Sequence, residues 1–273
     1  MKRIALCLHG KYNNRLSASS GDDGSLYIKE VLLDQYPNYD VDVFIHCWDV
    51  EFQGKIEKFY KKFLKKSLFE TQIDFKEIIS KAGIDYSLFI PPGQQAFRTC
   101  ANSLSFFYSR KRAIELKSDY EKERGFEYDC VIASRFDLGQ LDKHNGSQPY
   151  KGSEINFNPN FDMNYVYVAM GDQLNCGYSD AWFYSNSKNM NKIASLYEKS
   201  LEYFAPNSNY MQALNAWPDS NADDNFSNEF FKSGDFKSKN LYQYKAENAI
   251  NNHAMYKWFF IDTKLYSLSR FVC

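Results

Sequence analysis

Residues 127–137 read EYDCVIASRFD, and they join a short apolar run to a charged end. The apolar run at 131–133 is typical of a central strand that is covered on both faces. Arg135 and Asp137 follow it, and in open α/β sheets ligands bind just beyond the carboxyl ends of such strands. Two residues apart in an extended chain, these side chains point the same way. The pair can bind a cation and a phosphate, and an Arg–Asp pair that closes the strand is an equally good interpretation.

Two apolar segments near the N-terminus end in polar residues in the same way. Residues 4–8 (IALCL) lead into a glycine-containing loop, and residues 41–45 (VDVFI) lead into HCWD. Helical periodicity over 26–36 links them, which predicts a right-handed βαβ unit with both strand tips at one edge of a sheet. A polar loop at such a tip suits a phosphate or a base. The candidate nucleotide contacts at these tips are His9, Gly10, Lys11 and Asp49.

Basic and apolar residues alternate at helical spacing in residues 55–66 (KIEKFYKKFLKK), within a predicted helix over 51–66. An amphipathic surface helix is the simplest interpretation. Peripheral contact with a membrane through its basic face is a second one. Asp49 can be the N-cap of this helix instead of a ligand contact. Before it, the Ser-, Gly- and Asp-rich residues 17–25 predict a mobile loop.

A long helix is predicted over residues 100–124, where apolar side chains recur at steps of three and four. Its middle contains Arg110, Lys111 and Arg112. One of these can reach a diphosphate, and a solvated basic face is the alternative. We take Tyr108 and Arg112 from this helix as candidate nucleotide contacts. A shorter helix is predicted over 75–82.

Short apolar segments alternate with acidic loops beyond residue 140. They predict strands at 155–157 and 165–168, a helix over 189–204, and strand-like pieces at 241–244 and 256–261. Neither an internal repeat nor a polar linker divides the chain. We therefore expect a single α/β domain over residues 1–273, with a mixed, mostly parallel sheet flanked by helices.

Charge and composition exclude several other classes of protein. The formal net charge of −1 gives no bias toward nucleic acid. No apolar run approaches the roughly 20 residues that span a bilayer, and the N-terminus lacks a signal-peptide core. We therefore expect a cytoplasmic protein without a transmembrane segment. Its six cysteines show no C-x-x-C spacing, which favours reduced, buried thiols over a zinc site or disulfides.

Five segments of the chain together resemble one family of enzymes. They are IALCLHGKYNN (4–14), DVDVFIHCWD (40–49), SLSFFYSRKRAIELKSDYE (103–121), YDCVIASRFDL (128–138) and SDAWFYSNSKNM (179–190). In this order they are similar to GT-A-type glycosyltransferases of bacterial surface-polysaccharide loci and of large algal DNA viruses, the chlorovirus capsid-glycan transferases. The resemblance implies a GT-A-like, Rossmann-like fold in which residues 1–140 bind the nucleotide sugar and residues 141–273 bind the acceptor. It also places a viral member of the family in the host cytoplasm.

The resemblance implies a metal site at the charged strand end. The family usually has Arg-x-Asp where most relatives carry Asp-x-Asp, so Asp137 is the one certain carboxylate ligand for Mn²⁺ or Mg²⁺. His253 is a candidate late metal ligand, with a core or surface histidine as the alternative. Arg135 is expected to assist at the diphosphate or only to orient Asp137.

An inverting transferase also needs a carboxylate that deprotonates the attacking hydroxyl. By resemblance Asp180 is the first candidate, because the SDAWFY element lies beside the donor sugar in such folds. Glu229 and Asp223 are the reserves. The structural alternatives are a cap for Asp180 and a surface helix charge for Glu229.

The expected activity is transfer of a hexose or pentose from a nucleotide-diphosphate donor to the hydroxyl of a glycan or glycoprotein acceptor. The resemblance implies a UDP-sugar as the donor, UDP-xylose among them. Two other interpretations stay open. One is a different nucleotide-dependent transferase on a similar sheet, and the other is a carbohydrate-binding or capsid-associated module without catalysis.

Overall fold

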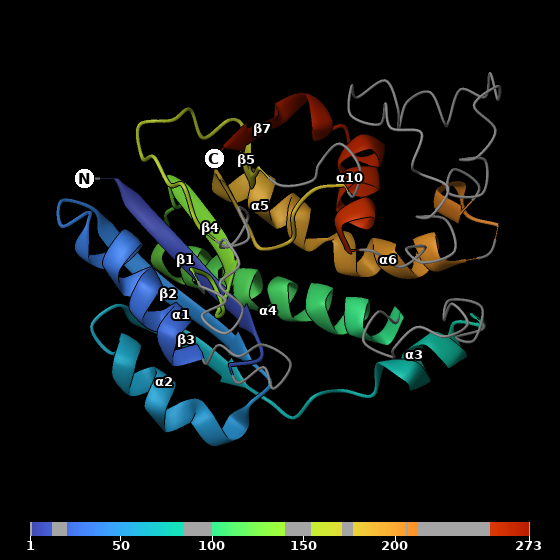
Figure 1. Ribbon diagram of the computed structural model, residues 1–273, viewed down its shortest axis with the longest axis horizontal. Coiled ribbons are helices and arrows are strands. Elements are labelled where there is room, and N and C mark those ends of the chain that lie inside the picture. The colour runs from blue at the N-terminus through green and yellow to red at the C-terminus, as the bar shows by residue number, and fades with distance from the viewer. Residues whose placement is uncertain are drawn as a thin grey trace, which may run out of the picture.

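A seven-stranded sheet in the order β3-β2-β1-β4-β6-β5-β7 forms the centre of the computed structural model (Figure 1). The structure describes residues 2–12, 21–84, 100–139, 154–170, 177–205, 207–211 and 252–272. The strands are β1 (Arg3–Gly10), β2 (Asp40–Cys47), β3 (Leu64–Phe69), β4 (Cys130–Arg135), β5 (Val166–Ala169), β6 (Trp182–Ser185) and β7 (Ser269–Val272).

Most strand pairs in this sheet are parallel. β1 pairs in parallel with both β2 and β4, β2 with β3, and β5 with β7. β6 runs antiparallel to its neighbours β4 and β5. The predicted fold class, a mixed and mostly parallel sheet flanked by helices in one domain, is therefore confirmed.

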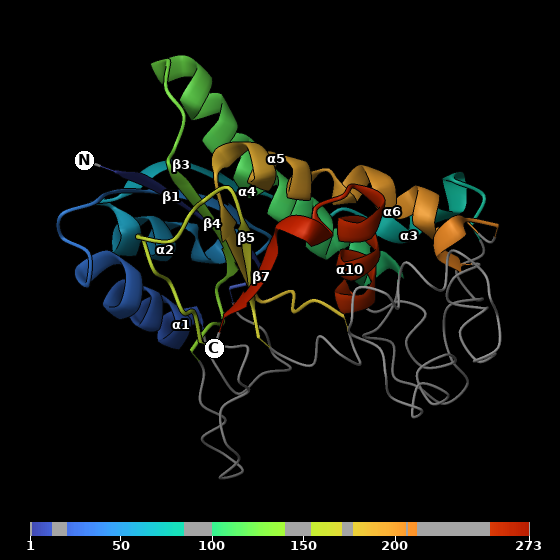
Figure 2. The same cartoon turned by 90° about the horizontal axis from the view of Figure 1, so that it is seen from above.

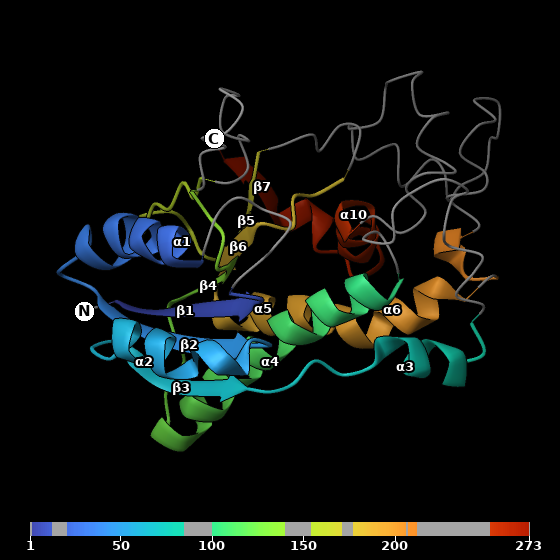
Figure 3. The ribbon, with the colours of Figure 1, turned by 60° about the horizontal axis from the view of Figure 1, so that its bottom comes forward.

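Helices cover both faces of the sheet. They are α1 (Gly21–Ile28), the π-helical η1 (Lys29–Asp34), the 3₁₀ turn η2 (Val50–Phe52), α2 (Gln53–Tyr60), α3 (Phe75–Lys81), α4 (Cys100–Arg124), α5 (Ser187–Ala194), α6 (Leu196–Phe204), α10 (Asn252–Asp262) and the 3₁₀ turn η5 (Tyr266–Leu268). One core contains side chains from α1, η1 and α2, and a second core contains side chains from α3, α4, α5, α6 and α10. Figures 2 and 3 show α1 and α4 on opposite sides of β1.

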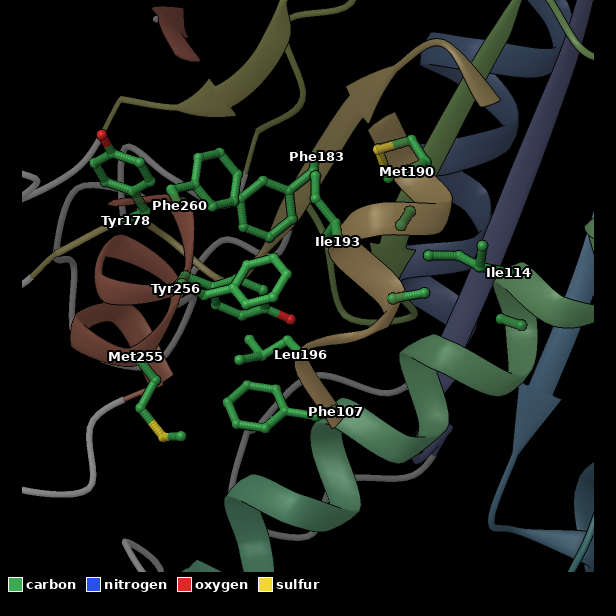
Figure 4. Close-up of a cluster of buried hydrophobic side chains, with 14 of the residues drawn as sticks. Phe107, Ile114, Tyr178, Phe183, Met190, Ile193, Leu196, Met255, Tyr256 and Phe260 are labelled. Atoms are coloured by element: carbon green, nitrogen blue, oxygen red, sulfur yellow. The ribbon is translucent and has the colours of Figure 1, made fainter. Parts of the chain in front are cut away.

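Alternation along β1 divides its side chains between these two cores. Leu6 and Leu8 pack on the α1 side, whereas Ala5 and Cys7 pack on the α4 side. The two-residue period of a strand therefore directs His9 toward α4 as well. On that side, Figure 4 shows how α4, α5, β6 and α10 contribute apolar side chains to one cluster.

The predicted helix over 51–66 is wrong in its second half. Helix α2 ends at Tyr60, and the segment after it becomes the edge strand β3, which pairs in parallel with β2. The Val43 N–H donates to the Phe63 carbonyl at 2.9 Å, where this pairing begins. Completing backbone hydrogen bonds along β2 therefore outweighs the helical preference of the lysines and leucine in this segment.

Three other predictions differ from the structure. The strand-like piece at 256–261 belongs to helix α10, whose residues 254–260 are all buried, and an element that is apolar all round has no strand or helix period. Residues 155–157 form no strand, and residues 21–25 of the predicted mobile loop open helix α1. A Cβ on Gly24 would lie 1.7 Å from the Phe136 carbonyl oxygen, so α1 approaches the end of β4 closely. The strand-like piece at 241–244 lies outside the described residues.

The described cysteines agree with the expectation of buried thiols. Cys7, Cys47, Cys100 and Cys130 are free and buried, and burial raises the pKa of Cys7, Cys47 and Cys100 to about 12. Among the described residues, every helix is too short or too polar to cross a bilayer.

Candidate functional site

The carboxyl ends of β2, β1 and β4 place three side chains in one row. In the sheet register His9 pairs with His46 on one side and with Arg135 on the other. All three follow the alternation that directs side chains toward α4. The expectation that these strand tips meet at one edge of the sheet is therefore confirmed for β1, β2 and β4.

Gly10 shapes the backbone at the end of β1. Its φ of +106° lies in a region that favours glycine. Its N–H donates to Ser109 Oγ on α4 at 2.7 Å, and its carbonyl accepts from the Trp48 N–H at 3.1 Å. A Cβ at this position would meet no atom within 4 Å, so conformation and not space requires the glycine. These two bonds hold the tips of β1 and β2 together over α4.

His46 extends these hydrogen bonds from Ser109 to Glu70. Because Ser109 Oγ accepts from Gly10, its single hydrogen is free to donate to His46 Nδ1, which lies 2.7 Å away. His46 Nε2–H then donates to Glu70 Oε1 at 2.9 Å. Burial lowers the pKa of His46, in agreement with this neutral ring, although Glu70 opposes the shift. These hydrogen bonds hold His46, at the tip of β2, between Ser109 of α4 and Glu70.

His9 has a single possible tautomer. Arg110 Nε–H donates to His9 Nε2 at 2.9 Å, and an arginine nitrogen cannot accept, so the imidazole carries its proton on Nδ1. Burial lowers the pKa of His9 well below its ordinary value, and the positive charges of Arg110 and Arg135 lower it further. His9 Nδ1 has no hydrogen-bond partner among the described residues, and the side chain is 1% exposed. His9 is therefore a neutral, buried hydrogen-bond donor.

Arg110 joins the N-terminal and C-terminal parts of the chain behind this row. Besides His9, its guanidinium donates to the Tyr256 hydroxyl at 2.7 Å and to the Asp180 main-chain carbonyl. Its carbon lies 4.7 Å from the centre of the Phe183 ring. Arg110 is 1% exposed, so the solvated basic face predicted for this part of α4 is wrong at this position. Burial lowers its pKa, and Tyr256 and Asp180 oppose the shift.

Arg135 connects the two carboxylates that the sequence singled out. Its Nε–H and Nη2–H donate to the two oxygens of Asp137, with Nε to Oδ1 at 2.7 Å, and Nη1 lies 3.5 Å from Asp180 Oδ1. Burial opposes the charge on Arg135, but Asp137 and Asp180 raise its pKa above the ordinary value. The Arg–Asp pair of the structural interpretation is thus present, and it lies inside the row of strand tips.

Asp180 precedes β6, and its carboxylate faces Arg135 of β4 together with Asn252 and His253 of α10. Its Oδ1 lies 3.4 Å from His253 Nε2, and its Oδ2 accepts from Asn252 Nδ2 at 3.0 Å. Burial alone raises the pKa of this carboxyl, but His253, Arg135 and Asn252 together lower it below its ordinary value. A carboxylate with a strongly lowered pKa is a weak base, which speaks against Asp180 as the proton acceptor. The expected base role stays untested.

The remaining candidates lie at different distances from this cluster. Tyr108 stacks on Trp48 with the ring centres 5.4 Å apart, which places it near the β2 tip. Arg112 Nη1 donates to Glu115 at 2.6 Å on the outside of α4. Asp49 precedes η2 in the N-cap position without a side-chain cap bond, so neither expected role is assigned to it.

Of the three other candidate residues, only Lys11 lies among the described residues. Lys11 is exposed directly beyond the tip of β1. Glu229 and Asp223 lie outside the described residues. Sequence reasoning missed Arg110 and His46 as residues that position the others.

The carboxylates and the histidine do not form a ready metal site. Among the described residues, no group of three or more His, Cys, Asp or Glu side chains is placed to hold a metal ion. Asp137 is hydrogen-bonded to the guanidinium of Arg135, and Asp180 Oδ1 lies 3.5 Å from its Nη1. A divalent cation would have to displace that guanidinium, since it needs several oxygen ligands of its own. The arrangement of these residues therefore does not fit the expected Mn²⁺ or Mg²⁺.

A hollow at the opposite edge of the sheet is a weaker candidate. It is lined by Lys2, Ile4, Cys130 and Asp162, among others, at the amino ends of β1 and β4. Lys2 Nζ in this region donates to the Pro159 carbonyl at 2.9 Å. We place the candidate site at the carboxyl ends, where charged and polar side chains of β1, β2, β4 and α10 converge with Asp180.

Comparison with known proteins gives a distant likeness among solved structures. No protein-family model matches the chain, and no curated protein matches it. Among solved structures, it resembles the apo form of mouse xyloside xylosyltransferase 1, over 99% of this chain and 84% of that chain, with 10% sequence identity and a TM-score of 0.43. A likeness of this degree identifies neither a family nor an activity for this chain.

Proposed function

We propose that this protein is a glycosyltransferase that takes a sugar from a nucleotide-diphosphate donor. The observation that carries the proposal is the row of His46, His9 and Arg135 at adjoining strand tips, which Asp180 and His253 from the C-terminal half complete. Donors of this kind bind beyond the carboxyl ends of parallel strands. The five sequence segments that resemble glycosyltransferases contribute these same residues, apart from His253.

The reaction requires stabilisation of the negative charge that forms on the leaving diphosphate. The bond between the anomeric carbon and the phosphate oxygen breaks, the acceptor oxygen bonds to that carbon, and the acceptor proton goes to a base. Arg135 is the described cation best placed for the leaving group, because it lies at the strand tips and its side chain is 35% exposed. A hydrogen-bonded cation at this position stabilises the transition state more than the ground state.

The finer features of the reaction belong to the same proposal. UDP-xylose or another UDP-sugar is the proposed donor, a glycan hydroxyl is the proposed acceptor, and inversion is the proposed outcome. Since Asp180 is held ionised by its neighbours, we assign it to the support of Arg135 and His253. Glu229, outside the described residues, is the proposed base.

A panel of sugar nucleotides tests the proposal. Thermal unfolding is measured with UDP, GDP, free sugars and buffer alone, and hydrolysis of each donor is followed by release of the nucleoside diphosphate. A transferase is stabilised by its nucleotide by RT ln(1 + [L]/Kd). A carbohydrate-binding module would instead respond to free sugar and not to the nucleotide. Absence of both nucleotide binding and donor hydrolysis would overturn the proposal.

A further inference from the structure

The hydrogen bonds of Arg135 leave one edge of its guanidinium available for a ligand. An arginine has five N–H donors, and its Nε and Nη2 are engaged side-on by Asp137. The contact from Nη1 to Asp180 is long, at 3.5 Å, and no further partner of Nη1 or Nη2 is found among the described residues. Asp137 thus orients the guanidinium, and the N–H groups on the edge between Nη1 and Nη2 can donate to a second bidentate partner.

The His9 Nδ1–H is a second donor without an acceptor, on the strand next to that of Arg135. Arg110 fixes this proton on Nδ1, and the nitrogen is sealed from solvent. A buried N–H group without a partner destabilises the fold, so such a group is rare unless a ligand or a buried water accepts its hydrogen bond. His9 and Arg135 are register partners on adjoining parallel strands, and their side chains lie on the same face.

The guanidinium edge of Arg135 and the His9 Nδ1–H both donate to oxygen acceptors, and the guanidinium carries a positive charge. The ligand chemistry that matches a guanidinium edge beside a neutral N–H is a phosphate group. A divalent cation matches neither donor, since both would repel it. The position between Asp137 and Asp180, where a cation would bind, is taken by Arg135 itself.

We propose that Arg135 and the His9 Nδ1–H hold the diphosphate of the donor directly, without a divalent cation, and that Asp137 is a positioning residue for Arg135. This inference rests on the proposed function. On departure of the nucleoside diphosphate, the electron pair of the broken bond stays on the phosphate oxygen, and the guanidinium faces the charge that develops there. Arg135 remains protonated throughout, so no proton is transferred at this position.

Nucleotide binding in the presence of a chelator is the first test. Calorimetry measures the affinity of the nucleoside diphosphate identified by the donor panel, in EDTA and then with Mn²⁺ or Mg²⁺. We expect the two affinities to agree within about threefold, and donor hydrolysis to continue in EDTA. A loss of tenfold or more in affinity or in turnover on chelation would overturn the inference and leave the proposed function standing, since the nucleotide would still bind with metal.

Substitution of Arg135 is the second test. Arg135→Gln removes the charge and should weaken nucleotide binding in EDTA by about tenfold or more, because hydrogen bonds to charged groups are the strong ones. Arg135→Lys keeps the charge without the bidentate edge, so its nucleotide affinity should lie between those of Arg135→Gln and the unsubstituted protein. Arg270→Gln in the edge strand β7 is the matched control and should bind as the unsubstituted protein does. Equal binding by Arg135→Gln and the unsubstituted protein would contradict the assignment.

The two amide substitutions of His9 separate ligand binding from folding. Asn places an amide near the position of Nδ1, so His9→Asn keeps a donor for the ligand but removes the acceptor of Arg110. Gln reaches the position of Nε2, so His9→Gln keeps the acceptor for Arg110 but removes the donor. We expect His9→Asn to bind nucleotide within about threefold but unfold more easily, and His9→Gln to remain stable but bind about fivefold or more weakly. Unchanged nucleotide binding by His9→Gln would overturn the assignment of the Nδ1–H to the ligand.

Asp137→Asn distinguishes a positioning residue from a metal ligand. An amide oxygen can still accept from Arg135, so nucleotide affinity in EDTA should fall by about threefold to tenfold, and added Mn²⁺ should not change the ratio between variant and unsubstituted protein. If the deficit appears only when Mn²⁺ is present, Asp137 is a metal ligand and the inference is wrong. If no variant and no unsubstituted protein binds any nucleotide, the proposed function itself fails.

Discussion

Arg110 donates its Nε–H to Nε2 of His9 across 2.9 Å, and this bond determines the hydrogen-bonding character of the β1 tip. A histidine in water exchanges between two tautomers and a charged form, whereas His9 is restricted to one neutral tautomer. Because burial and the neighbouring arginines lower the pKa of His9, the neutral ring offers the same donor around neutral pH.

The tautomer of His9 can be observed directly. In ¹⁵N-labelled protein, two-bond ¹H–¹⁵N correlation should show His9 with a protonated Nδ1 and an unprotonated Nε2, unchanged from pH 8 to pH 6. His46, with its proton on Nε2, should show the opposite pattern and serves as the internal control. A His9 signal that titrates near the ordinary histidine pKa would show that the bond from Arg110 is absent in solution.

Loss of Arg110 should destabilise the fold. Arg110→Met leaves the Asp180 carbonyl, the Tyr256 hydroxyl and His9 Nε2 without their donor in a buried place. We expect the free energy of unfolding to fall by about 2–4 kcal/mol, since each unsatisfied buried group is costly.

Urea denaturation measures this difference, and Arg112→Met provides the control on the same helix. Arg112 is more than a third exposed and pairs with Glu115, so its loss should change stability by less than about 1 kcal/mol. Similar effects of the two substitutions would contradict the anchoring role of Arg110.

A buried ion pair on α4 should also carry stability. Lys117 Nζ lies 2.9 Å from Glu121 Oε2, with the two side chains 0% and 7% exposed, and Ser187 from α5 bonds to both. Lys117→Met should cost about 3–5 kcal/mol, because it leaves a carboxylate buried without its counter-charge.

The double variant with Glu121→Gln tests that explanation. Glutamine is neutral and can still accept from the Tyr128 N–H, so much of the lost stability should return. If the double variant is as unstable as the single one, packing and not charge explains the loss.

Stability should decrease as the pH falls below neutrality. Burial lowers the pKa values of His9 and His46 in the folded protein, so below about pH 6.5 the unfolded chain binds protons that the folded chain does not. Stability then rises with pH in this range, by up to about 1.4 kcal/mol per pH unit for each such histidine. Denaturation series from pH 7.5 to pH 5 measure the slope, and His9→Gln should reduce it. A flat profile over this range would contradict the neutral state of both rings.

The sequence predicted the strand tips well because strands and tips have local signals. The apolar runs of β1, β2 and β4 and the polar residues that end them are contiguous in the chain. The helical connections between these strands are typical of parallel pairing, which brings the three carboxyl ends to one edge of the sheet. The roles of these tips required contacts that are distant in sequence, such as the one from Arg110 to Tyr256.

The spacing of the charged residues in α4 could have predicted their burial, although their charge favours exposure. Phe107, Arg110, Ile114, Lys117 and Glu121 follow one another at steps of three and four, so Arg110, Lys117 and Glu121 lie on the apolar stripe of the helix. Charged residues on such a stripe are buried together with their partners. By contrast, nothing local distinguishes α10 from a strand, because it is buried on all sides.

The reversed direction of β6 sets the time at which the candidate site can form. Because β6 runs antiparallel to β4, Asp180 at its start meets Arg135 at the end of β4, and His253 reaches Asp180 from a segment 73 residues further along the chain. A nascent chain that ends before residue 253 can thus complete β1, β2 and β4 while lacking one wall of the site. Nucleotide binding should therefore appear late in synthesis, after most of the sheet has formed.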